Sequence, residues 1–356
     1  MTVPPSSPLS QFSYRRILLP VTIGIGVSVY LLIGLSPPDA TALAQLSITR
    51  HLLLGLLLAL LTVIVRDLAY MYRIWQLTDA KLSFFKCFEI IMLWEFGSSI
   101  TPASVGGVTL ALFILNKEKI SFGKGTAIII LCSYLDNIAF VSVFGLLFLL
   151  LGNSMFDLSA TCPSLADSTV VMAFRAVAQY VWLAFIVVAV IGGLLGFAIF
   201  VKPRWAQRFF GRLARVKILY RWADNIHLLG TEIWHASHEF KTRGVGFVVK
   251  ILFATILSWC ARYALANALI WTFSTIDLHQ LDVFARQYIH RIIVMIPATP
   301  GGSGIAELSF MAMNCEYLPA GLASSVAVVW RIYNFYLYLA IGAIVLPRWL
   351  ARVSKL

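Results

Sequence analysis

The chain has 356 residues, of which 60% are hydrophobic and 12% charged, and its mean hydropathy is +0.86. This composition excludes a soluble globular domain, because apolar runs of about 20 residues recur and each is long enough to cross ~30 Å of hydrocarbon. The formal net charge of +12 is concentrated beside these runs, as membrane topology requires, so nucleic acid is not an expected partner. The sequence predicts an all-α polytopic membrane protein.

In chain order, six segments are predicted to cross the membrane as helices. They are residues 17–35, 51–70, 125–151, 176–201, 244–275 and 320–346. Two further apolar stretches, 84–115 and 287–317, are each interrupted by Thr-Pro and a pair of glycines. The first crossing follows a polar tail, 1–16. A cleaved signal peptide is the alternative there, but the apolar run is longer than a typical h-region.

The distribution of basic residues decides how the two interrupted stretches are inserted. Suppose that each interrupted stretch enters and leaves the membrane on the same side. The cytoplasmic segments then hold most of the 28 Lys and Arg residues. If both cross fully, the basic loops 116–124 and 202–243 move outside, against the positive-inside rule. The sequence therefore predicts two re-entrant hairpins and places both chain termini in the cytoplasm.

The predicted order of elements repeats. Two crossings, a hairpin and one crossing make residues 17–151, and the same order makes residues 176–346. The first half begins inside and the second outside, so the hairpins enter from opposite sides, as in the inverted repeats of secondary transporters. Residues 152–175 are expected to form an external loop. Residues 202–243 are expected to lie on the cytoplasmic membrane surface, and 347–356 to form a cytoplasmic tail.

The composition of each interruption favours a ligand-binding break between two half-helices. The first reads SSITPASVGGVTL from Ser98 and the second IPATPGGSGIAEL from Ile296. Proline ends one half-helix, and the glycines let the next begin with free N–H groups at the positive end of its dipole, where phosphate or carboxylate binds. The alternative is a tight turn with no ligand. The residues of these motifs predicted to bind substrate are Thr101, Pro102, Gly106, Gly107, Thr299, Pro300, Gly301, Gly302 and Gly304.

Charged residues inside the membrane are the second class of candidates, because each costs several kcal/mol unless it is paired or solvated. The alternative role is an internal salt bridge that holds two helices together. Arg66 and Asp67 are assigned to the membrane interface. The candidates for substrate binding are Arg262, Arg291, Arg331 and Glu307, and those for proton or ion coupling are Glu95, Asp136 and Glu307.

The stretch TPGGSGIAE at 299–307 resembles the signature of the lysylphosphatidylglycerol synthase transmembrane (flippase-like) family. The resemblance extends over nearly the whole chain, to VRDLAYMYRIWQL at 65–77, TPASVGGVTLALFIL at 101–115, YLDNIAFVSVFGLL at 134–147 and WRIYNFYLYLAIG at 330–342. It implies an activity that moves polar lipids between leaflets, sometimes coupled to lipid modification, and a location in the bacterial inner membrane.

The chain departs from the family pattern in three places. Val108 and Thr109 stand where relatives often have a polar or acidic residue, and Tyr338 stands where they often have proline. Bifunctional relatives continue into a soluble aminoacyl-transferase domain, whereas this chain ends at Leu356. The lipid-lysinylating reaction is therefore not expected here.

The leading functional hypothesis is a transporter that moves a phosphate-bearing lipid between leaflets, with the headgroup held between the two hairpins. No Walker motif occurs, so direct drive by ATP is not expected. The expected partners are membrane lipids with anionic or zwitterionic headgroups, and a homodimer is left open.

Three alternatives are left open. A membrane-embedded enzyme acting on lipid-linked phosphate or glycan needs an acid–base pair or metal ligands, and His235 and His238 in the cytoplasmic loop lack a partner motif. No Cys-x-x-Cys or Cys/His spacing indicates a metal, and no cofactor is expected. The others are a transporter of small soluble anions and a structural partner of another membrane protein.

Overall fold

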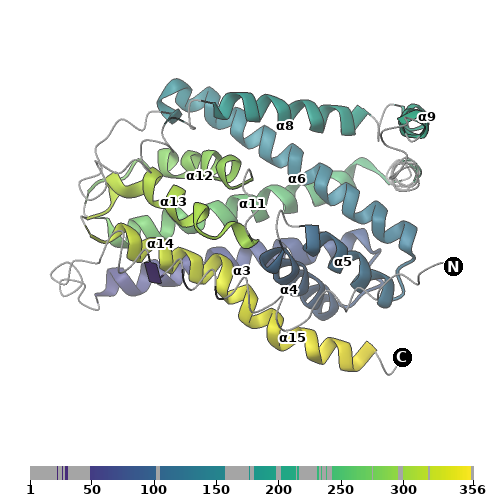
Figure 1. Cartoon of the computed structure of the whole chain (residues 1–356), viewed down its shortest axis with the longest axis horizontal. Coiled ribbons are helices and arrows are strands. Elements are labelled where there is room, and N and C mark those ends of the chain that lie inside the picture. The colour runs from purple at the N-terminus through teal and green to yellow at the C-terminus, as the bar shows by residue number, and fades with distance from the viewer. Residues whose placement is uncertain are drawn as a thin grey trace.

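The computed structural model describes residues 49–101, 105–156, 180–197, 202–213, 243–274, 276–295, 300–319 and 321–353, together with isolated positions elsewhere. Every regular element within these residues is a helix (Figure 1). The prediction of an all-α membrane protein is therefore confirmed at the level of fold class.

Among the described residues, four helices are long and apolar enough to span a membrane. They are α3 (Arg50–Leu77), α6 (Phe122–Leu151), α11 (Val245–Phe273) and the continuous run Ala323–Val353. That last run joins α14 (Ala323–Arg331), one π-helical turn η9 (Ile332–Tyr336) and α15 (Leu337–Val353).

The two remaining predicted crossings are not established as spans. The segment 17–35 lies outside the described residues except for isolated positions. The segment 176–201 contains α8 (Val181–Gly196), whose 16 residues make about 24 Å of helix, less than the hydrocarbon thickness. The short elements that complete the described chain are η4 (Gly152–Phe156), α9 (Pro203–Leu213) and η8 (Cys315–Tyr317).

The first interrupted stretch forms a helical hairpin, here called Hairpin 1, from α4 (Phe84–Ile100) and α5 (Val105–Lys117). Its helices are antiparallel, because Gly107 of α5 lies against Ser98 of α4 while Lys86 Nζ at the base bonds Glu118 Oε2 at 2.6 Å. A Cβ added to Gly107 would come within 1.9 Å of the Ser98 hydroxyl. Glycine is thus needed at this position for close helix contact.

The second interrupted stretch forms Hairpin 2, from α12 (Gln280–Met295), the short turn η7 (Pro300–Gly302) and α13 (Ile305–Asn314). Arg286 Nη1 donates to the Met313 carbonyl at 2.7 Å, and nearer the tip His290 Nε2 lies 3.0 Å from the Ala306 carbonyl. These pairings make the two helices antiparallel.

The long helices α3 and α11 make the most extensive helix–helix contact of the described chain. They run antiparallel, because Gly55 packs on Thr272 at one end and Arg73 Nη1 donates to Thr255 Oγ1 at 3.3 Å near the other. In Figure 1 Hairpin 1 lies toward the right end of the bundle and Hairpin 2 toward the left. The tip of α4 contacts η7, so the hairpins meet between the two ends.

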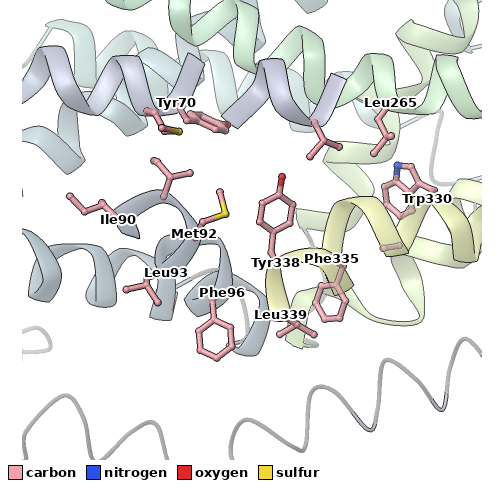
Figure 2. Close-up of a cluster of buried hydrophobic side chains, with 14 of the residues drawn as sticks. Tyr70, Ile90, Met92, Leu93, Phe96, Leu265, Trp330, Phe335, Tyr338 and Leu339 are labelled. Atoms are coloured by element: carbon pink, nitrogen blue, oxygen red, sulfur yellow. The ribbon is translucent and has the colours of Figure 1, made fainter. Parts of the chain in front are cut away.

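The exterior of the bundle is apolar and its interior carries charge. On α3, Leu57 is 60% exposed, whereas Arg66 and Arg73 are only 2% and 3% exposed. A soluble protein has the opposite arrangement, so the exposed leucines are suited to contact with lipid. Figure 2 shows the packed interior, where Tyr338 of α15 points its hydroxyl toward α3.

Candidate functional site

A polar cavity of about 310 Å³ lies where the tips of the two hairpins meet. We call it the hairpin cavity. Its walls come from α4, α11, α12, η7 and the α14–η9 segment. The polar side chains that line it are Glu95, Ser98, Ser99, Thr101, Arg262, Tyr263, Gln287, His290, Arg291, Arg331 and Asn334.

A second cavity, of about 280 Å³, adjoins the first and is lined by α3, α4, α5, α6, α11 and α12. We call it the α3 cavity. Arg73, Ser133 and Asp136 line only this cavity, together with the rings of Tyr70 and Trp259. Four polar side chains line both cavities and so mark the boundary between them: Glu95, Ser98, Arg262 and Arg291.

The boundary contains a network of ion pairs. Arg262 pairs with Glu95 through a short contact, and Arg66 Nη2 lies 3.8 Å from the same carboxylate. Arg66 also bonds its neighbour Asp67 at 3.0 Å, and the Tyr338 hydroxyl donates to both Asp67 oxygens at 2.9 and 3.0 Å. Each of these two arginines and two carboxylates therefore has a partner, as burial in a medium of low dielectric constant requires.

A separate pair closes one side of the α3 cavity. Arg73 of α3 and Asp136 of α6 form a short salt bridge. Trp259 Nε1 donates to the same Asp136 oxygen at 2.9 Å, so the carboxylate is held by side chains from two other helices. Asp136 keeps 28% of its side chain exposed, which leaves it in contact with the cavity.

The turn of Hairpin 2 is held by a third pair. Arg331 Nε donates to Glu307 Oε1 at 2.6 Å, and Arg331 Nη2 donates to the Gly301 carbonyl at 2.9 Å. The other Glu307 oxygen accepts the Gly304 N–H at 2.8 Å. Glu307 thus caps the amino end of α13 with its own carboxylate, and it is fully buried. A bound anion would have to compete with this carboxylate for the amino end of α13.

The glycines of this turn are required by its backbone. Gly301 and Gly302 have φ angles of +59° and +68°, values at which side chains are strained. A Cβ on Gly301 would also come within 2.1 Å of the Phe335 ring. Phe335 belongs to the π-helical turn η9, and such turns often mark functional positions.

Arg291 differs from the other arginines at the boundary. Its guanidinium lies 5.0 Å from the centroid of the Trp259 ring. No carboxylate lies within salt-bridge distance of it in the part of the chain that the structure describes. It borders both cavities.

The structure brings most of the predicted site residues together. The hairpin cavity is lined by Thr101, Gly301, Gly302, Glu95, Arg262, Arg291 and Arg331, and the α3 cavity by Asp136. Gly107 instead packs against α4, and Gly304 and Glu307 lie beneath the turn rather than in the cavity wall. Pro102 and Thr299 lie outside the described residues, and only the backbone is described at Gly106 and Pro300.

Sequence analysis missed part of the network. Arg66, which was assigned to the interface, is buried among helices, and the side chain of Asp67 beside it is only 16% exposed. Arg73 lies on α3 although the predicted crossing ends at residue 70. Their spacing in the sequence could have indicated that they belong to one helix. Arg66, Tyr70 and Arg73 recur at i, i+4 and i+7 and so share one face of a helix. The buried tyrosine Tyr338 had no such signal.

No group of three His, Cys, Asp or Glu side chains suited to a metal occurs among the residues that the structure describes. His290 faces a carbonyl and the rings of Phe310 and Trp330, and no acid lies beside it in that part of the chain. The polar side chains that line the described site can recognise charge and form hydrogen bonds.

Comparison with known proteins agrees with this picture. The family model for the lysylphosphatidylglycerol synthase TM region matches residues 17–342. A UPF0104 membrane protein of Archaeoglobus fulgidus is 22% identical over 264 residues, which are 74% of this chain and 76% of that protein. No solved structure matches the chain.

Proposed function

Because the chain belongs to the lysylphosphatidylglycerol synthase transmembrane-region family, we propose that it moves a phosphate-bearing lipid from one membrane leaflet to the other. The polar headgroup passes through the two adjoining cavities while the acyl chains stay in the hydrocarbon. In this proposal the protein is a transporter, without catalytic chemistry of its own.

The repeated order of the elements is the first support. The order long helix, hairpin, long helix occurs as α3, Hairpin 1 and α6, and again as α11, Hairpin 2 and the run Ala323–Val353. The corresponding helices α3 and α11 run in opposite directions, as an inverted repeat requires. Transporters built in this way hold their substrates between broken helices near the bilayer midplane.

The charges at the two ends of the bundle support an orientation. Lys86, Lys124 and Arg352 lie at the base of Hairpin 1, where they contact Glu118, Asp79 and Glu118, respectively. The base of Hairpin 2 has fewer basic residues: it carries Arg286, which pairs with Glu316, together with Asp277 and Asp282. We propose that the protein lies in the inner membrane. By the positive-inside rule, the base of Hairpin 1 then faces the cytoplasm.

One observation favours a lipid over a soluble anion. Met295 lines the hairpin cavity and is 55% exposed, and Val108 lines the α3 cavity and is 39% exposed. Each polar cavity is therefore bordered by an exposed apolar side chain. A lipid needs this arrangement, because its headgroup is polar and its chains are not.

The test is lipid movement in liposomes that contain the purified protein and a phospholipid with a fluorescent acyl chain. Dithionite bleaches only the outer leaflet, so transport increases the fraction bleached with time. We expect faster bleaching with the wild type than with empty liposomes. Asn334→Trp, which fills the hairpin cavity, should abolish the gain, whereas Ile344→Trp on the lipid-facing side of α15 should not.

Two outcomes would contradict the proposal. Equal bleaching with and without the wild-type protein would exclude lipid movement. Uptake of labelled phosphate or sulfate by the same liposomes would then favour the soluble-anion alternative, and release of a modified lipid would favour an enzyme. Equal rates for wild type and Asn334→Trp would show that lipid moves by a route other than this cavity.

A further inference from the structure

Resting on the proposed function, we infer that Arg291 binds the phosphate of a singly charged phosphodiester, and that the transported lipid is anionic with an uncharged polar headgroup. The charges around the two cavities are unequal in number. Their lining contains four arginines, namely Arg73, Arg262, Arg291 and Arg331.

Three of these arginines are already neutralised by carboxylates. Arg73 pairs with Asp136, and Arg262 pairs with Glu95. Arg331 pairs with Glu307, which lies behind the turn. The aromatic face of Trp259, 5.0 Å from Arg291, stabilises a cation but adds no negative charge. The described lining therefore has one uncompensated positive charge, located at Arg291.

The position of Arg291 suits a substrate that passes between the cavities. Its side chain lines both of them, as do Glu95 and Arg262. A phosphate held at Arg291 is therefore reachable from either cavity. The neighbouring Glu95–Arg262 pair forms the rest of the boundary and leaves Arg291 as the cation free to take a ligand.

Buried polar atoms near Arg291 lack partners and can complete a phosphate site. The Tyr263 hydroxyl and Arg262 Nε are buried donors without a hydrogen bond, and both residues line the hairpin cavity. Tyr263 is 7% exposed. Asn334 Oδ1, a buried acceptor without a partner, lines the same cavity and suits a hydroxyl of the headgroup.

Charge balance selects the class of lipid. A phosphodiester carries one negative charge and matches the single unpaired cation. A phosphomonoester carries about 1.5–2 negative charges near neutral pH and would leave an excess of negative charge. A zwitterionic headgroup brings a cation, but Glu95 and Asp136 are already paired. An uncompensated charge inside the membrane is strongly unfavourable. A phosphomonoester and a zwitterionic headgroup are therefore both disfavoured.

The binding test uses short-chain lipids with the detergent-solubilised full chain, measured by calorimetry. We expect dihexanoyl phosphatidylglycerol to bind more tightly than dihexanoyl phosphatidylcholine or phosphatidic acid. Arg291→Gln should weaken phosphatidylglycerol binding by about tenfold or more. Arg291→Lys keeps the positive charge and should weaken this binding less. Arg204→Gln, an exposed cation on α9, is the matched control and should bind like the wild type.

The transport test uses the same three headgroups with fluorescent acyl chains in liposomes. Faster movement of phosphatidylglycerol, lost in Arg291→Gln, is the expected result. Phosphatidylglycerol binding that does not depend on Arg291, or equal binding of all three lipids, overturns the inference. Arg291-dependent binding without any lipid movement would instead keep the site and refute the proposed function. A single symmetric size-exclusion peak for each variant shows that it is folded.

Discussion

Several single residues that hold the bundle together are arginines buried with their carboxylates. The Arg331–Glu307 pair has exposed fractions of 3% and 0%. Arg331→Gln leaves a buried carboxylate without its cation and should cost about 3–5 kcal/mol. The expected result is a large fall in the thermal unfolding temperature in detergent.

Two matched variants check that interpretation. Arg348→Gln removes an exposed arginine from the same helical run and should leave the unfolding temperature close to that of the wild type. The double variant Arg331→Met/Glu307→Leu removes both charges and should recover much of the loss, because apolar replacement of a buried pair is often neutral. If Arg331→Gln is as stable as the wild type, this pair does not hold the turn.

The backbone of the Hairpin 2 turn gives a second residue-scale prediction. Gly301→Ala must place a side chain at φ +59°, which costs about 1–2 kcal/mol in the left-handed region. It must also displace Phe335, whose ring would lie 2.1 Å from the new Cβ. We expect lower thermal stability and slower lipid movement. Gly145→Ala, with open space around it, is the control and should show neither change.

At the scale of elements, the base of Hairpin 1 is attached to α15 through Glu118. This carboxylate accepts hydrogen bonds from Lys86 Nζ at 2.6 Å and Trp349 Nε1 at 3.1 Å, and it contacts Arg352. Burial alone would raise the pKa of Glu118, but its bonds with Lys86 and the charge of Arg352 together lower that pKa below its ordinary value. The attachment is therefore strongest when Glu118 is ionised.

The sign of this shift makes a pH prediction. A lowered pKa means that Glu118 stabilises the fold at neutral pH and loses this contribution as the pH falls through the lowered value. The wild type should therefore unfold at a higher temperature than Glu118→Gln at pH 7, and the difference should shrink below about pH 4. A difference that is unchanged between pH 7 and pH 3.5 would contradict the attachment.

The four long helices and the two interrupted stretches were predictable because hydropathy and glycine motifs are local signals. Both interrupted stretches form hairpins that break close to the predicted motifs. Hairpin 2 was predicted to begin at residue 287, whereas α12 begins at Gln280, because its first turns include Asp282 and Arg286 and are too polar to register as membrane-embedded.

The pairing of charges was not predictable from the sequence. Asp67 and Tyr338 are 271 positions apart and Arg73 and Asp136 are 63 apart, so only the packing of helices brings them together. Likewise, α3 extends past Tyr70 to Leu77 because its polar end is buried by other helices, whereas hydropathy alone ends the crossing at residue 70.

At the scale of the whole molecule, the central claim is that two hairpins enter the membrane from opposite sides and meet between the leaflets. Both ends of Hairpin 1 must then lie on one side and both ends of Hairpin 2 on the other. Four exposed or partly exposed positions report on these ends: Lys81, Lys119, His279 and Pro319.

The direct measurement is labelling of single cysteines with a membrane-impermeant maleimide in spheroplasts, using a variant that lacks the five native cysteines. Our account predicts that His279→Cys and Pro319→Cys react in intact spheroplasts, and that Lys81→Cys and Lys119→Cys react only after permeabilisation. Opposite accessibility of the two ends of either hairpin would show that it crosses the membrane, and would contradict the account.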